Sequence, residues 1–125
     1  MTEKEDCIFC KIVRGEIKSK IVKSSNSCIA IRDIHPVAEG HTLVIVKQHF
    51  GTLLDMPNRL GEELVKFTKE VASDMLDKKL GDGFNIVMNN LPAAGQEIMH
   101  AHFHVIPRKE GDGIRWLTRA GLCEN

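Results

Sequence analysis

Three histidines at alternate positions in the segment 95–107 are the first feature of this sequence that could support chemistry. His100, His102 and His104 are interleaved with apolar residues. This alternation predicts a strand with one imidazole face. The outer two rings would lie about 13 Å apart, so a single bound group would contact one or two of them, and we expect the rings to have different roles. Two interpretations are open from the spacing alone: a metal site built from His-x-His, or a histidine nucleophile supported by its neighbours.

Two of the four cysteines form a second candidate site. Cys7 and Cys10 have the C-x-x-C spacing of zinc ligands, with two buried thiols on a short helix as the alternative. A redox role is less favoured, because no strand precedes the pair as it does in thioredoxin-like proteins. Cys28 lies in an apolar segment and is predicted to be a core thiol, while Cys123 is predicted to be a terminal thiol.

Composition limits the classes of partner. The chain has 125 residues, 42% of them hydrophobic, and 17 basic residues balance 17 acidic ones. A single domain spanning 1–125 is therefore expected, with no overall field to attract nucleic acid or an acidic membrane. The polar segment 1–6 does not resemble a leader, and the apolar run 43–46 is too short to cross a bilayer. We predict a soluble cytoplasmic protein, with the nucleus as a further location in a eukaryote.

Helices and strands must position the histidines and cysteines. A short N-terminal helix would carry the C-x-x-C pair, capped by Asp6 and ended by Gly15. Apolar residues at helical spacing predict one long helix that begins at Pro57 and ends at Gly81. Besides the histidine segment, strand character is found at 20–23, 27–33, 41–47 and 84–89. This order indicates an α+β fold with a mainly antiparallel sheet.

The pattern G-Q-x-I-x-H-x-H-x-H-x-I-P-R at 95–108 resembles the signature of the histidine triad (HIT) family of nucleotide hydrolases and transferases. The resemblance extends from Cys7 to about Trp116 and includes F-C-K-I at 9–12, D-I-x-P at 33–36, G-H-T-L-V-I at 40–45 and N-x-x-x-N at 85–89. It implies a HIT-like sheet of roughly five antiparallel strands, and a homodimer in which two sheets continue across a two-fold axis. The chain is most similar to nucleoside phosphoramidase-like members with an N-terminal C-x-x-C.

The resemblance implies a role for each site residue. His102 would be the nucleophile that attacks the α-phosphorus of a nucleotide and forms a covalent nucleotidyl-imidazole. His104, His41 and Gln96 would stabilise the phosphate oxygens or hold His102 in place. The substrate, a purine nucleotide such as AMP, would lie among further residues of the motifs. These are Phe9, Ile12, Ile31 and Ile34 around the purine, Asp33 at the ribose hydroxyls, and Asn89, Gly95 and Glu97 near the phosphate and leaving group.

Glu97 departs from the family pattern, in which Ser or Thr commonly follows Gly-Gln. A carboxylate only accepts hydrogen bonds, so a hydroxyl donor is lost at this position. Repulsion from a phosphate would slow turnover or turn the side chain outward. Alternatively, Glu97 would favour a cationic leaving group such as a lysyl or other amine moiety.

The resemblance also implies a structural zinc ion that catalysis does not require. His49 and His100 would join Cys7 and Cys10 in a closed Cys2His2 site with no position for water. The leading function is hydrolysis of purine nucleoside phosphoramidates or related adenylates. Alternatives are a dinucleoside polyphosphate hydrolase, a zinc hydrolase that uses His102 and His104 as ligands, and an AMP-binding regulator with incidental turnover. Trp116 is expected near the partner subunit's site.

Overall fold

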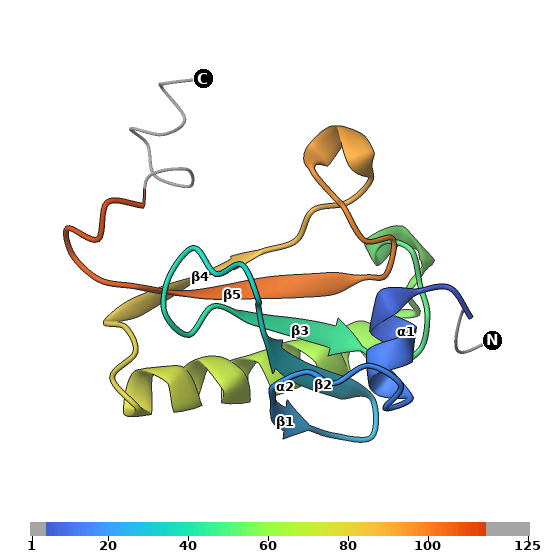
Figure 1. Ribbon diagram of the computed structural model, residues 1–125, viewed down its shortest axis with the longest axis horizontal. Helices are drawn as coiled ribbons and strands as arrows, with labels where there is room; N and C mark the ends of the chain where they lie inside the picture. Colours follow the sequence, from blue (N-terminus) through green and yellow to red (C-terminus); the bar gives the residue numbers. More distant parts are fainter. Residues whose placement is uncertain (1–4, 115–125) are drawn as a thin grey trace.

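A five-stranded antiparallel sheet with the strand order β1-β2-β3-β5-β4 forms the centre of the protein (Figure 1). The computed structural model describes residues 5–114, so Trp116 and Cys123 lie outside the described residues. The strands are β1 Ile21–Ser24, β2 Cys28–Arg32, β3 Thr42–Val46, β4 Gly83–Val87 and β5 His102–Arg108. The helices are α1 Ile8–Val13 and α2 Asn58–Asp77, with 3-10 turns η1 Leu53–Asp55 and η2 Pro92–Ala94. The predicted α+β fold is confirmed.

The two helices cover opposite faces of the sheet, because side chains alternate along each strand. On one face, the apolar stripe of α2 packs against Val44, Val46 and Val105. On the other, Phe9 and Ile12 of α1 pack against isoleucines of β2 and β3. All five residues of β3 are buried, since this strand is covered on both sides. In Figure 1, α2 runs along the sheet and α1 lies beside the end of β3.

Both helices differ from the sequence prediction at one end. Asp6 was expected to cap α1, but Cys7 is the N-cap, and its Sγ accepts from the amide of Cys10 at 3.5 Å. The long helix ends at Asp77 rather than at Gly81, because the chain turns through Lys79, which has a φ of 61°. Glycine is the usual residue in that conformation, so a lysine at this position does not indicate the earlier end.

The histidine segment is only partly a strand. β5 begins at His102, whereas the preceding residues 98–100 form a bend. His102 and His104 therefore share the α1 face, in register with Ile45 and Leu43 of β3. His100 lies outside the ladder, so the expectation of three imidazoles on one strand face is wrong for this ring. Within residues 5–114, no helix is both long enough and apolar enough to cross a membrane.

Candidate active site

His102 is held with one ring nitrogen committed and the other free to react. Its Nδ1 lies 2.6 Å from the carbonyl oxygen of His100. A carbonyl only accepts, so Nδ1 carries the ring proton and Nε2 keeps its lone pair. Phe9 packs edge-on against the ring at a centroid distance of 4.9 Å. Burial lowers the pKa of His102, which keeps the imidazole neutral and nucleophilic near pH 7.

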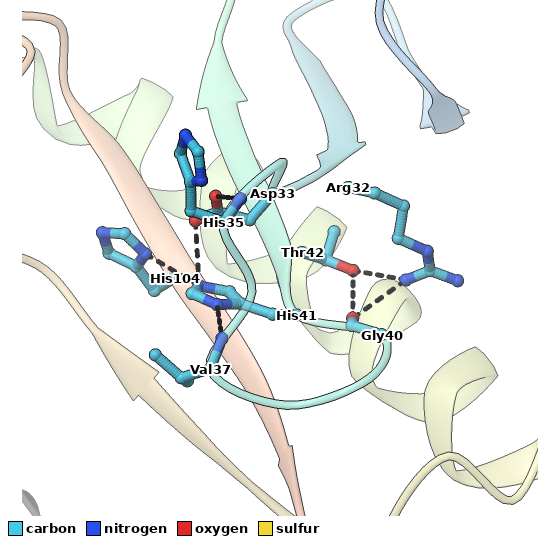
Figure 2. A network of polar contacts seen from close by, with 8 residues as sticks. All are labelled: Arg32, Asp33, His35, Val37, Gly40, His41, Thr42 and His104. Atoms are coloured by element: carbon cyan, nitrogen blue, oxygen red, sulfur yellow. Dashed lines mark hydrogen bonds and ion pairs between the residues drawn. The ribbon is translucent and has the colours of Figure 1, made fainter.

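A chain of polar contacts lies beside this nucleophile (Figure 2). His41 Nε2 is 3.0 Å from His104 Nδ1 and 3.4 Å from Asp33 Oδ2, and the amide of Val37 donates to His41 Nδ1 at 3.2 Å. Burial lowers the pKa of both His41 and His104. The ring of His104 lies 5.1 Å from that of His102, between centroids. One neutral imidazole, His104, thus lies next to the nucleophile, and a second, His41, lies behind His104.

The histidines open into a cavity of about 460 Å³. The structure places every residue predicted for catalysis or substrate binding on its wall. Apolar side chains of the wall come mainly from α1 and β2, whereas polar side chains come from the loop 33–41, from β5 and from the segment 89–97. A pocket with an apolar slot and a few converging polar groups fits a small amphipathic ligand such as a nucleotide. Ile34 is 83% exposed, so it borders the opening rather than the interior.

Sequence reasoning missed several residues of the wall. Leu43 could have been found, because it lies two residues after His41 in the predicted strand 41–47 and should face the same side. The others carried no signal, since all but Arg32, the last residue of β2, come from loops or exposed positions. They are Ile8, Ile17, Lys18, Ser19, Arg32, His35, Val37 and Ile98.

Gln96 borders the cavity, but its amide is engaged by the backbone. Its Oε1 accepts from the Leu91 amide at 2.6 Å, and its Nε2 donates to the carbonyls of Gly51 at 2.7 Å and Ile98 at 3.0 Å. The amide of Gly95 likewise donates to Pro92 at 2.9 Å. These bonds fix the shape of the loop 91–98. In this conformation the Gln96 side-chain amide and the Gly95 backbone N–H, which were predicted to contact the phosphate, are both bonded to the backbone of the protein instead.

Asn89 and Glu97 lie around this loop. Gly95 has a φ of 95°, a backbone conformation that residues with a side chain rarely adopt, so this turn favours glycine. A Cβ at this position would lie 3.8 Å from the Asn89 amide nitrogen, which is an ordinary van der Waals contact. Glu97 is exposed at the cavity wall, and its negative charge raises the pKa of His104 against the larger effect of burial.

The four predicted metal ligands come together at the ring of His100, whereas its carbonyl faces His102. The ligand atoms of Cys7, Cys10, His49 and His100 all lie within 4.8 Å of one another. Each histidine Nδ1 lies 3.3 Å from one sulfur, with His49 beside Cys10 and His100 beside Cys7. In a tetrahedral zinc site the sulfur-to-nitrogen separation is about 3.6 Å, so the donor set and its spacing fit zinc.

His100 is prepared as a ligand. Its Nε2 lies 2.6 Å from the carbonyl oxygen of Val46, which places the ring proton there and leaves the Nδ1 lone pair facing the sulfurs. Burial lowers the pKa of His100 to about 4, so the ring is neutral at pH 7. The same residue thus serves both sites, with its ring toward the cysteines and its carbonyl toward His102.

Known proteins are similar to this chain in both sequence and fold. The model of the HIT domain matches residues 14–111. An uncharacterized HIT-like protein of Methanocaldococcus jannaschii is 50% identical over 109 residues, which cover 86% of this chain and 82% of that protein. The adenosine 5'-monophosphoramidase HNT1 of Candida albicans is 36% identical over 128 residues, covering 96% and 84%.

One similar solved structure contains zinc. The zinc-bound histidine triad family protein of Mycobacterium smegmatis is 35% identical, with a TM-score of 0.83 over 86% of this chain and 78% of that one. The domain match covers most of the chain, and the relatives agree along nearly its whole length. The chain therefore belongs to the HIT family.

Proposed function

We propose that this protein hydrolyses purine nucleoside phosphoramidates and related adenylates through a covalent intermediate on His102. The observation that carries the proposal is the neutral ring of His102, whose Nδ1 is bound to the His100 carbonyl while the rest of the ring borders the cavity. A relative that is named an adenosine 5'-monophosphoramidase supports the substrate class.

The geometry supports a two-step reaction. The purine would occupy the apolar slot beside Phe9 and Ile31, and Asp33 would accept hydrogen bonds from the ribose hydroxyls. His102 Nε2 then attacks the α-phosphorus, the phosphorus–nitrogen bond breaks, and the leaving nitrogen takes a proton from solvent and departs as the amine. Water next attacks the nucleotidyl-imidazole and returns one proton to solvent, which releases AMP and restores the neutral ring.

The two other imidazoles of the site would stabilise charge during both steps, one directly and one through its neighbour. His104 borders the cavity and would donate a hydrogen bond to a non-bridging oxygen as negative charge develops there. His41 contacts His104 rather than the nucleophile and would orient it. The shell of Phe9 and Ile31 excludes water from the purine end, which strengthens these electrostatic interactions.

The zinc ion would have a structural role in this scheme. Bound zinc supplies a tetrahedral cross-link, and four protein ligands leave no position for a reacting water. Cys7 and Cys10 would connect α1 to His49, which follows β3, and to His100, which precedes β5. The helix that carries Phe9 is thereby fixed against the nucleophile.

Trapping the intermediate tests the proposal. Rapid acid-free quenching during turnover of an AMP phosphoramidate should give protein heavier by one adenylyl group, and the adduct should map to His102 by peptide mass analysis. Release of AMP without any adduct, in rapid-quench samples taken before the first turnover ends, would contradict the covalent route. Faster adduct formation from a dinucleoside polyphosphate would assign the protein to that hydrolase class instead. Tight AMP binding with negligible turnover would favour a regulatory role.

Glu97 is proposed to select a leaving group with a positive charge. Replacement Glu97→Ser removes a carboxylate at the cavity wall and restores a hydroxyl donor. We expect kcat/KM for a phosphoramidate with a lysyl-type leaving group to fall about fivefold relative to kcat/KM for a phosphoramidate with an uncharged leaving group. This change is consistent with about 1 kcal/mol for one exposed charge pair. Glu97→Gln is the matched control for size and should show the same loss of preference. An unchanged ratio between the two substrates would rule out this role.

We also propose a homodimer that forms through β4. This strand ends the sheet, and no described strand pairs with its outer side. Phe84 and Ile86 are 40% and 47% exposed on it, and Val65 of α2 is 52% exposed. An exposed apolar edge favours pairing with a second copy. Sedimentation should therefore give a dimer for the wild type and a monomer for Ile86→Lys. A monomeric wild type at micromolar concentration would contradict this arrangement.

A further inference from the structure

A backbone amide beside the active site fixes the protonation pattern of two histidines. A neutral imidazole has one N–H and one lone pair, so a bond at one nitrogen determines what the other nitrogen offers. The Val37 amide lies 3.2 Å from His41 Nδ1. Because an amide N–H only donates, His41 Nδ1 must accept with its lone pair. The ring proton of His41 therefore resides on Nε2.

This proton gives the contact between the two rings a direction. His41 Nε2 lies 3.0 Å from His104 Nδ1, so it donates, and Asp33 Oδ2 at 3.4 Å is a second acceptor for the same proton. His104 Nδ1 accepts, which leaves the proton of His104 on Nε2, on the other side of its ring (Figure 2). The reverse direction would need a proton on His41 Nδ1, where the Val37 amide already points.

His102 has the opposite pattern. Its Nδ1 donates to the His100 carbonyl, so its Nε2 carries the lone pair. The rings of His102 and His104, with centroids 5.1 Å apart, thus offer a lone pair and an N–H respectively. An electrophilic phosphorus with negatively charged oxygens needs this combination. A His104 ring of the other tautomer would direct a second lone pair at those oxygens.

We propose that the Val37 amide is a positioning group, which sets the direction of the His41–His104 chain so that His104 presents an N–H beside the lone pair of His102. The amide acts, not the side chain, since Val37 is 48% exposed. The loop is itself closed by hydrogen bonds from the Asp33 amide to the His41 carbonyl at 2.9 Å and from the His41 amide to the Ala38 carbonyl at 3.0 Å. The catalytic consequence rests on the proposed function, whereas the tautomer pattern does not.

Nitrogen NMR tests the pattern directly in the free protein. Long-range proton–nitrogen correlation spectra of the zinc-loaded protein, labelled with ¹⁵N-histidine, distinguish the two tautomers at neutral pH. We expect His41 and His104 as Nε2–H tautomers and His102 as the Nδ1–H tautomer. A His41 or His104 ring with its proton on Nδ1 would overturn the proposal, whatever substrate the enzyme uses.

A matched pair of variants tests the amide. Val37→Pro removes the N–H, and Val37→Ala keeps it while shortening an exposed side chain. In Val37→Pro we expect mixed tautomers at His41 and His104 and a fall in kcat of about 10- to 100-fold with little change in KM, as for loss of one oriented donor. Val37→Ala should keep the wild-type tautomer spectrum, because its backbone N–H is still present. Retention of the single Nε2–H tautomers in folded Val37→Pro would overturn the proposal.

A second pair does not depend on the loop tolerating proline. His41→Gln places an amide N–H near the original Nε2, whereas His41→Asn reaches only the position of Nδ1. His104 should therefore stay an Nε2–H tautomer in the glutamine variant and become mixed in the asparagine variant. The same His104 tautomer in both variants would show that His41 does not direct it. An inactive wild type with the expected spectra would count against the proposed function alone.

Discussion

The variant His102→Ala is expected to release AMP from an AMP phosphoramidate at least about 10⁴-fold more slowly than the wild type, because it removes the only atom proposed to bond to phosphorus. His102 Nε2 is singled out by the bond from Nδ1 to the His100 carbonyl. The neighbouring ring cannot replace it, since His104 Nδ1 is already held by His41. Single-turnover assays with excess enzyme measure the chemical step without product release.

Two controls separate the chemistry from folding and binding. His102→Asn has a side-chain amide that can still donate to the His100 carbonyl but offers no reactive lone pair, so it should be folded and equally slow. Glu62→Ala removes an exposed side chain of α2, which covers the face of the sheet opposite the cavity, and it should stay within about threefold of the wild-type rate. AMP affinity should change little in all three variants. A rate for His102→Ala within tenfold of the wild type would contradict the nucleophile assignment.

The sequence indicated the fold well where a pattern repeats. The apolar stripe of α2 and the fully buried run of β3 produce elements close to those predicted, because packing on the sheet demands that spacing. The end of α2 was missed, since Lys79 takes up a left-handed conformation that glycine normally marks. Local signals fail where long-range packing determines the turn.

The residue types of the candidate site could be predicted from the sequence, but the hydrogen bonds between its residues and the backbone could not. Alternation placed His102 and His104 on one face, yet it also predicted His100 there, because spacing alone cannot show where a strand begins. The binding of Gln96 to three backbone groups had no counterpart in the motif, since those partners lie far apart in the sequence or in irregular loops. The role of the Val37 amide could not be predicted either, because every residue except proline has a backbone N–H and the sequence does not show where it points.

Removal of zinc is expected to lower the melting temperature by at least about 15 °C. Structural zinc sites contribute several kcal/mol or more to folding, and each kcal/mol corresponds to about 3–5 °C in a domain of this size. The ligands join three separate parts of the chain, namely α1, the segment after β3 and the bend before β5. Calorimetry of protein before and after dialysis against a strong chelator, with zinc measured in both samples, checks this result.

Cysteine variants provide a matched control for the zinc prediction. Cys10→Ser should lose zinc and melt as the chelated protein does, because Cys10 Sγ faces both histidine ligands. Cys28→Ser alters an equally buried thiol that lies on the α2 face, away from the four ligands, and it should keep a full zinc content with a smaller loss of stability. Less than half a zinc ion per chain in the purified wild type, or an unchanged melting temperature after chelation, would contradict a structural site.

The same experiment distinguishes a structural metal from a catalytic one. If zinc were bound by His102 and His104 for catalysis, chelation would abolish activity and leave the melting temperature nearly unchanged. In the proposed arrangement, stability falls first, and activity follows because the His100 carbonyl that orients His102 belongs to a zinc ligand. At 10 °C, with circular dichroism showing that the zinc-free protein is still folded, we expect turnover to drop about tenfold, consistent with a misoriented nucleophile, and to recover when zinc is restored.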